Sequence, residues 1–254
     1  MNARLETTTP DSTAPAALSA EQAIGQIAVE LPGATAVFRR LKLDFCCGGQ
    51  TSLRQASADK ALNLDAVMAE LAALNRVDVL PAVTDSSTLI DHILTRYHDV
   101  HREQLPELIR MARRVEAVHR ENPSVPNGLA ELLECMEEEL ISHMLKEEQI
   151  LFPMMKSGGH PFVSQPISMM RHEHVGHGSM LDKVLALTND AIPPQGACNT
   201  WRALYAGIAQ LNEDLINHIH LENNVLFPQF EGSTQATPAP AASQGCGSGG
   251  CGCA

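Results

Sequence analysis

Two copies of one short motif carry most of the residues that could do chemistry. The sequence HMLKEEQILFP begins at His143 and HIHLENNVLFP begins at His218, 75 residues later, with His, Glu, Leu, Phe and Pro at the same offsets. In each copy a glutamate, Glu147 or Glu222, follows the histidine by four residues, so the two side chains share one face of a helix. Imidazole and carboxylate at this spacing are typical of metal sites inside helical bundles. The repeat therefore predicts two helices that each offer one nitrogen ligand and one carboxylate.

The apolar pattern around the motif places these ionisable groups in a core. At about 100° per residue, His143 and Glu147 fall within the apolar arc of their helix, and the second copy repeats this arrangement. A buried carboxylate without a partner is costly, and neither face carries a Lys or Arg at a matching position. A metal would supply the missing positive charge. The alternative of ordinary core histidines and surface carboxylates is disfavoured, because chance would not keep the acid on the buried face twice.

Two other helical patterns offer the remaining histidines. Measured to the histidine of the following motif copy, the gaps are 45 and 44 residues for His98 and His174, and 42 and 41 for His101 and His177. Spacing alone therefore leaves both pairs open. Periodicity favours His174 over His177 and, by symmetry, His98 over His101, although His101 lies nearer the centre of its own apolar face.

One histidine from each of two helices and a His-x-x-x-Glu from each of the other two give six ligands, which are too many for one tetrahedral zinc and suit two metals bridged by carboxylates. The predicted ligands are His98, His143, Glu147, His174, His218 and Glu222. Two carboxylates in a helical bundle favour iron. Glu139 and Asp214 each precede a ligand histidine by four residues, and we expect them to accept a ring N–H or to hold a water.

The positioning of these residues requires four long helices. Helical patterns fill residues 86–230 and are interrupted by breakers at 123–128, 158–161 and 193–196, which predicts an all-α, up-and-down four-helix bundle. A small helical domain is expected at residues 19–75, joined to the bundle by a linker at 76–85. The composition of residues 1–18 and 231–254, rich in Thr, Ser, Pro, Ala and Gly, predicts a disordered N-terminus and a flexible Gly/Cys-rich tail.

The cysteines form two groups outside the bundle pattern. Cys46 and Cys47 are adjacent and precede two glycines, so they could act as a redox dithiol, a ligand for transferred iron or an acceptor of a nitrosyl group. The alternative is two small buried residues at a turn. Cys246, Cys251 and Cys253 lie in the Gly-rich tail, where a thiolate site for a soft metal and an inert tail are about equally supported.

Composition excludes several classes of protein. The formal net charge is −12, with 30 acidic and 18 basic residues, the wrong sign for binding nucleic acid or an anionic membrane surface. No apolar run reaches the roughly 18 residues of a membrane span, and the first 20 residues lack the apolar stretch of a signal peptide. We therefore expect a cytoplasmic protein with reduced thiols.

The motifs YHDVHREQLPEL, SHMLKEEQILFP, EHVGH and HIHLENNVLFP, together with the upstream LDFCCGG, resemble the iron–sulfur cluster repair di-iron proteins of the RIC or ScdA family. The resemblance covers roughly residues 19–230 and implies a hemerythrin-like bundle. It also implies a centre of two non-haem irons, held by the six predicted ligands, with Glu147 and Glu222 bridging beside an oxo or hydroxo group. On this basis His98 is preferred over His101. The extra histidine of oxygen-carrying hemerythrins is not found at the matching spacing, which disfavours reversible oxygen carriage.

The resemblance further implies a function. The expected protein takes part in repair of iron–sulfur clusters damaged by nitric oxide or peroxide, by binding or reducing nitric oxide at its iron centre or by donating iron. Its expected partners are damaged iron–sulfur proteins and nitric oxide, and the sequence does not decide whether it forms a homodimer. The alternative is a hemerythrin-like sensor or store for nitric oxide or oxygen without repair activity. The attached CCGG domain disfavours that alternative, because a simple store has no use for a dithiol.

Overall fold

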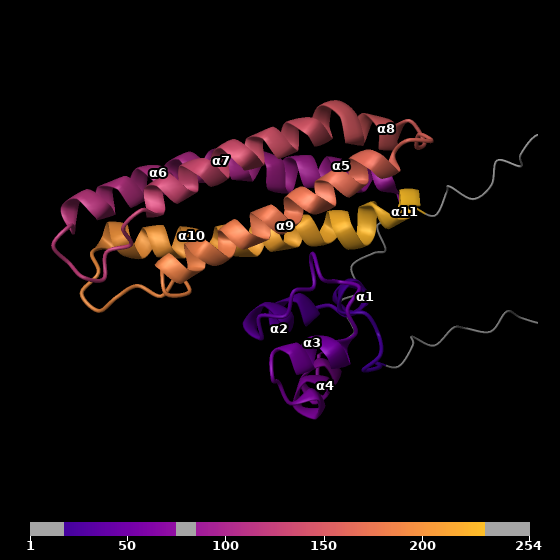
Figure 1. Cartoon of the computed structure of the whole chain (residues 1–254), viewed down its shortest axis with the longest axis horizontal. Helices are drawn as coiled ribbons and strands as arrows, with labels where there is room; N and C mark the ends of the chain where they lie inside the picture. The colour runs from indigo at the N-terminus through magenta and orange to yellow at the C-terminus, as the bar shows by residue number, and fades with distance from the viewer. Residues whose placement is uncertain (1–17, 75–84, 232–254) are drawn as a thin grey trace, which may run out of the picture.

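The chain is all-α, with a small helical domain beside a long four-helix bundle (Figure 1). The computed structural model describes residues 18–74 and 85–231, and within these ranges the only β pairing is an isolated bridge between Ala23 and Ser52. The expected disorder of the two ends, most of the expected linker and the tail cysteines fall outside the described residues. None of the helices in these ranges has the length and apolar character needed to cross a membrane.

The small domain is built from short helices that enclose their own apolar core. They are α1 (Ile24–Glu30), α2 (Ala34–Arg40), α3 (Leu53–Asp59) and α4 (Leu64–Ala72). Ser52 and Asn63 cap α3 and α4 by accepting the backbone N–H three residues later, at 3.2 and 3.0 Å. Phe38 and Phe45 are at most 1% exposed and pack with their ring centroids 5.8 Å apart. The Cys46-Cys47 turn lies between α2 and α3.

Four long helical rods form the bundle, and three of them contain a short π-helical segment. The rods are α5 (Ser86–Ile93) with η1 (Leu94–His98) and α6 (Asp99–Val118); α7 (Leu129–Lys146) with η2 (Glu147–Leu151) and α8 (Phe152–Lys156); α9 (Ser164–Leu187); and α10 (Asn199–Leu221) with η3 (Glu222–Leu226) and α11 (Pro228–Glu231). Short connections join successive rods, which run side by side along the long axis (Figure 1).

The π segments coincide with predicted ligands. His98 is the last residue of η1, whereas Glu147 and Glu222 are the first residues of η2 and η3. In η3 the N–H of Phe227 donates to the carbonyl of Glu222, five residues back, at 2.8 Å. Pro153 and Pro228 follow shortly after, and a proline can neither donate an N–H nor tolerate the carbonyl four residues back. A widened turn relieves this conflict, and π turns of this kind are frequent at functional sites.

Two apolar clusters fill the bundle, one toward each end. Each rod contributes to both clusters, and its buried His and Glu residues lie near the junction of the two contributions. On α7 and η2, for example, Leu140 and Met144 precede Glu147, and Leu151 follows it. The ionisable groups therefore form a polar layer inside an otherwise apolar core. Such a layer is stable only if its charges and hydrogen-bonding groups are satisfied.

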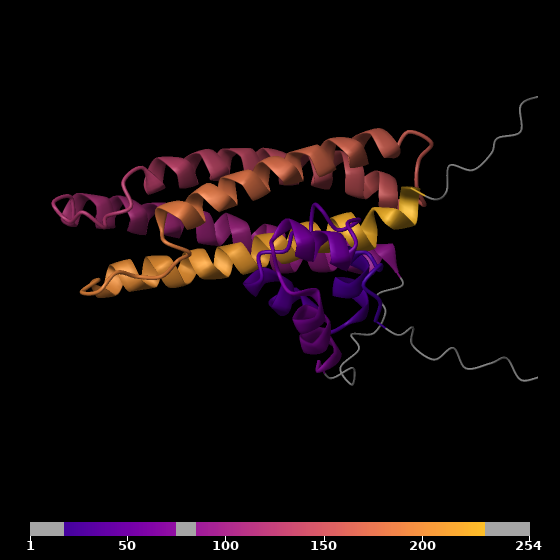
Figure 2. The same ribbon diagram turned by 60° about the horizontal axis from the view of Figure 1, so that its bottom comes forward.

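The small domain packs against the C-terminal half of the fourth rod (Figure 2). Asn224 donates through Nδ2 to the carbonyl of Phe45 at 3.1 Å. A Cβ atom on Gly25 or Gly49 would lie 2.6 or 2.5 Å from the Asn224 Oδ1, so both positions need glycine for this close approach. Arg39 adds an ion pair with Glu213 at 2.8 Å. The two domains thus form a defined interface beside η3.

Candidate metal centre

The structure brings the six predicted ligands together in the polar layer. Each is at most 1% exposed. They form two groups, within each of which the potential ligand atoms lie within 4.8 Å of one another. Position A consists of His98, His218, Glu147 and Glu222, and position B consists of His143, His174, Glu147 and Glu222. The two glutamates belong to both positions.

Each glutamate gives one oxygen to each position. Glu147 Oε2 lies 3.4 Å from His98 Nε2 at position A, and its Oε1 lies 3.4 Å from His143 Nε2 at position B. Glu222 repeats this arrangement, with Oε1 3.1 Å from His218 Nε2 and Oε2 3.1 Å from His174 Nε2. Metal–ligand bonds of about 2.1 Å place neighbouring ligand atoms roughly 3.0–3.4 Å apart, so these spacings suit two cations bridged by both carboxylates.

The second nitrogen of three ligand histidines has a fixed partner. His143 Nδ1 lies 2.9 Å from Glu173 Oε2, and His98 Nδ1 lies 2.8 Å from Glu148 Oε1. His174 Nδ1 lies 2.9 Å from the Oδ1 of Asn223, whose Nδ2 donates elsewhere. Since carboxylate and amide oxygens only accept, these Nδ1 atoms carry the proton and their Nε2 atoms carry lone pairs. Partners of this kind orient metal-binding imidazoles.

The charges and lone pairs of the buried polar layer favour bound cations. At position B the two lone pairs on His143 Nε2 and His174 Nε2 lie 3.1 Å apart, and Glu147 finds no hydrogen-bond partner among the described residues for either oxygen. Burial, together with the nearby Glu222, raises the pKa of Glu147 well above its ordinary value, and burial lowers the pKa of His98 to about 4. The imidazoles of His98 and His143, whose pKa values burial lowers, are therefore neutral and cannot neutralise the carboxylates. Two cations would satisfy both sets of groups, so the residues fit a dinuclear metal centre.

The groups that hold the ligand rings differ from those expected. Glu139 is exposed and lies 4.0 Å from the Cys135 Sγ, so it does not turn inward. Asp214 is buried, but it accepts from Arg96 at 2.6 Å and from Gln210 at 3.0 Å. The expectation that these acids accept a ring N–H is wrong, because the free ring nitrogen of His143 points across to Glu173 on another helix, and Asp214 is held by Arg96 and Gln210. The partners found instead are Glu148, Glu173 and Asn223.

Comparison with known proteins identifies the family. Residues 89–230 match the Hemerythrin HHE cation binding domain, and residues 20–75 match ScdA_N, a domain of unknown function (DUF542). The iron-sulfur cluster repair protein YtfE of Cronobacter sakazakii is 49% identical over 211 residues, covering 82% of this chain and 96% of that protein. YtfE of Dickeya chrysanthemi is 48% identical over 212 residues, with the same coverage. This chain belongs to the iron–sulfur cluster repair family.

In this member of the repair family, the cysteine pair of the small domain lies at the domain interface. Cys46 and Cys47 are half-buried free thiols whose sulfurs are 3.8 Å apart. A hydrogen bond to Cys47, together with burial, raises the pKa of the Cys46 thiol. Asp44 Oδ1 accepts from the backbone N–H of Cys47 at 2.9 Å, and these three residues form a further group of potential ligand atoms.

A single amide connects this turn to the repair protein's metal centre. Asn223 donates through Nδ2 to the carbonyl of Cys46 at 3.0 Å and accepts through Oδ1 from His174 Nδ1 at 2.9 Å. It directly follows Glu222, which belongs to both positions. No pattern in the sequence singles out Asn223. Each of the three ring partners, Glu148, Glu173 and Asn223, does stand next to a predicted ligand in the chain.

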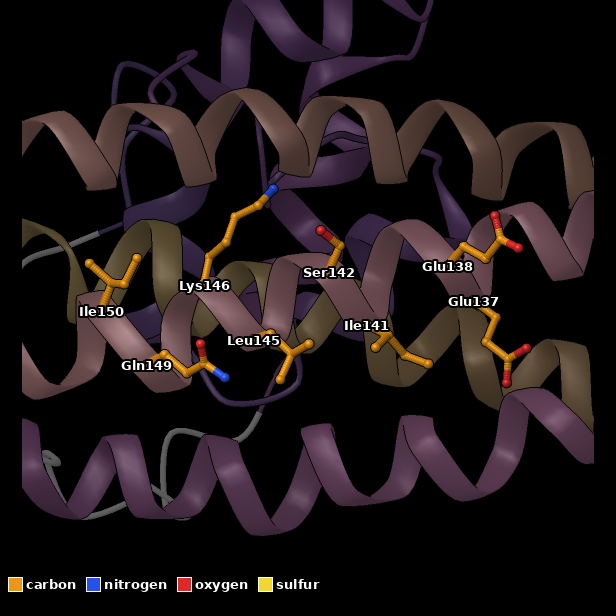
Figure 3. A pocket seen from close by; sticks show the side chains of 8 residues that line it. All are labelled: Glu137, Glu138, Ile141, Ser142, Leu145, Lys146, Gln149 and Ile150. Carbon is orange, nitrogen blue, oxygen red and sulfur yellow. The ribbon is translucent and has the colours of Figure 1, made fainter.

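A shallow surface hollow also lies on the second rod of this repair protein (Figure 3). Its lining includes Ile141, Leu145 and Ile150, and the last two are 40% and 53% exposed. It contains no predicted ligand. The chemistry of the molecule therefore centres on the buried layer and not on this hollow.

Proposed function

We propose that this protein holds two non-haem iron ions at positions A and B and takes part in repair of iron–sulfur clusters damaged by nitric oxide or peroxide. The observation that carries the proposal is the sharing of Glu147 and Glu222, each with one oxygen at either position. Two nitrogens and two oxygens per position suit iron, and they leave room for an oxo or hydroxo bridge and for a small ligand. The relatives' names, as cluster repair proteins, support the same function.

Bound ferrous iron would supply affinity for nitric oxide or a store of iron that can be donated. The chain's own residues keep the site ready for either role. Glu148, Glu173 and Asn223 fix three imidazoles with their Nε2 lone pairs inward. The apolar clusters on both sides exclude bulk water, so charge at the carboxylates is screened only by the cations.

The cysteine pair is the proposed acceptor of iron or of a nitrosyl group leaving the centre. Asn223 supports this role, because it joins the Cys46 turn directly to the ligand His174. The raised pKa of Cys46 keeps that thiol protonated while the domains are docked, and only the thiolate is a strong ligand or nucleophile. Transfer therefore requires Cys46 to lose its proton, which movement of the turn into solvent would favour.

The test is repair of a damaged cluster protein, which is the expected partner. The purified chain is loaded anaerobically with ferrous iron, its metal content is measured, and it is mixed with a [4Fe–4S] protein that has been treated with nitric oxide. We expect about two irons per chain, as in other carboxylate-bridged bundles, and recovery of the cluster absorbance. The double variant Cys46→Ser, Cys47→Ser should keep its iron and lose repair. Zinc or no metal in the wild-type protein, or equal repair without iron, would refute the proposal.

One observation favours the second candidate, a nitric oxide or oxygen sensor or store without repair activity. The Cys46 thiol is held protonated beside the centre, as suits a passive structural turn. Anaerobic titration with nitric oxide separates the candidates. Stoichiometric and reversible binding favours the sensor, whereas consumption of nitric oxide over many turnovers, or delivery of iron to an apo cluster protein, favours repair chemistry.

A further inference from the structure

Two buried histidines lie beside the candidate metal centre without belonging to either position. His101 is 0% exposed and His177 is 2% exposed. Each follows a ligand by three residues, His98 or His174, and so sits one turn further along the same rod. The ring of His101 packs against that of His218, with centroids 5.4 Å apart, and the ring of His177 packs against that of His143, at 4.8 Å. One extra imidazole therefore adjoins each position.

As placed, these rings are neighbours of the cations and not their ligands. Atoms bound to one metal at about 2.1 Å can be no more than about 4.2 Å apart. Within each of the two groups of potential ligands, the ligand atoms lie no more than 4.8 Å apart. Neither group includes His101 or His177.

The hydrogen-bonding groups of these rings are not satisfied by the protein. Within residues 18–74 and 85–231, neither ring nitrogen of His101 has a hydrogen-bond partner, and the same holds for Nδ1 of His177. A buried polar atom without a partner costs free energy, and native proteins rarely leave one. Two such rings at equivalent places therefore indicate a missing partner beside each position. A neutral imidazole has one N–H to donate, so each ring can offer a hydrogen bond to such a partner.

We propose that His101 and His177 bind a small polar ligand inside the core, each donating a hydrogen bond to a diatomic or water-sized molecule that occupies the space beside one cation. This inference rests on the proposed iron centre and deepens it, because it names the residues that recognise nitric oxide there. His101 serves position A and His177 serves position B. They are positioning residues that act on the ligand and leave the cations to the six residues already described.

The test uses the full-length, iron-loaded protein and nitric oxide as the probe. His101→Leu and His177→Leu remove the donor, His177→Gln retains one, and His172→Leu on the exposed side of α9 is the control. We expect all four variants to keep wild-type iron content. The two leucine variants should bind nitric oxide about tenfold more weakly, the effect of one lost hydrogen bond, with a shifted N–O stretching band. His177→Gln should restore most of the affinity.

The metal-free protein provides a readout that does not depend on iron. Replacing an unsatisfied buried imidazole by leucine removes a destabilising group, so the thermal midpoint of each leucine variant should rise relative to the wild type. Loss of iron from either leucine variant would overturn the proposal by making that histidine a ligand. Unchanged nitric oxide affinity in variants that retain iron would also overturn it. Failure of the wild-type protein to bind iron would instead refute the proposed function, and this inference with it.

Discussion

Positions A and B have the same ligand types but different surroundings. At position B the Nδ1 atoms of both histidines are hydrogen-bonded, that of His143 to Glu173 and that of His174 to Asn223. At position A the described residues offer a partner to His98 but none to Nδ1 of His218. The Tyr97 ring stacks on His218 instead, at 5.4 Å and an interplanar angle of 3°. Of the four ligand histidines, His218 is thus the one whose ring is held by an apolar surface and not by a hydrogen bond from Nδ1 to another described residue.

The difference indicates that the two positions are not equally strong. A hydrogen bond from Nδ1 fixes the orientation of the ring and makes its Nε2 a better metal ligand. Position B has two such ligands, and its Glu173 is itself held by Lys146 at 2.6 Å. Position A has one, whose Glu148 is held by Arg102 at 2.7 Å. We expect the cation at position A to be the first to exchange or leave.

The largest effect is expected where the two positions share a ligand. Glu222→Gln removes the carboxylate charge from both, so both cations should be lost, with affinity falling by more than the ~100-fold typical of a lost partner outside the ligand set. Metal analysis after dialysis measures this. Glu139→Gln, on the exposed side of α7, is the matched control and should change nothing. Loss of one cation only would show that the carboxylate is not shared.

Acid should distinguish the histidines beside the two positions in the metal-free protein. Burial lowers the pKa of His177 from 6.5 to about 4 and that of His101 to about 2. Below pH 6.5 the unfolded chain therefore binds more protons than the folded chain. The free energy of unfolding falls as the pH decreases from 6.5 toward the pKa values of the folded state. His177→Leu should remove up to about 3 kcal/mol of this loss between pH 6.5 and 4.

Denaturant unfolding at several pH values measures this dependence. The effect of His101→Leu should extend to lower pH than that of His177→Leu, because the His101 pKa is the lower of the two. Equal pH dependence in the wild type and both variants would contradict the burial argument. His172→Leu again serves as the exposed control.

Loss of the Glu173 partner should weaken position B more than loss of the Tyr97 ring over His218 weakens position A. Glu173→Gln replaces the anionic partner of His143 with a neutral one, and we expect a 10–100-fold loss of affinity at position B. Tyr97→Leu keeps an apolar cover over His218 and should have a smaller effect. Competition with a chelator, followed through the two dissociation phases, gives both affinities. A larger effect from Tyr97→Leu would reverse the proposed order of the positions.

The smallest effect is expected at the amide between the domains. Asn223→Leu removes both the His174 partner and the link to Cys46, so it should weaken position B about tenfold and speed hydrogen exchange in the small domain. Asn224→Ala is the matched control, since Asn224 also binds the turn but contacts no ligand histidine in the described hydrogen bonds. It should speed exchange without changing metal affinity. Identical behaviour of the two variants would argue against coupling through Asn223.

The sequence predicted the helical rods and the set of residues that meet in the core, because both depend on helical periodicity. His143 and Glu147 lie four apart on one apolar face, and any helix of that sequence would bury them together. Periodicity favoured His98 and His174 over His101 and His177, but it could not settle the choice, since all four are buried. The structure separates them by distance, and only the first pair lies within the two groups of potential ligand atoms.

Two features could not be read from a single helix pattern. The π segments begin at Glu147 and Glu222 and shift the helical hydrogen-bond register there. A pattern that assumes a constant rotation of 100° per residue does not represent this shift. The ring partners come from other rods, as Glu173 on α9 does for His143 on α7. Reasoning along one helix therefore led to Glu139, which lies a turn before His143 and faces solvent.

The sharing of ligands has a consequence for the duplicated sequence. His98 and His143 come from the first half of the bundle but sit at different positions, and His174 and His218 from the second half are divided in the same way. Neither copy of the motif therefore encloses a cation by itself. A polypeptide cut at the loop before α9 would yield two fragments that each hold half of two sites, and metal uptake would report directly on whether the fragments had reassociated.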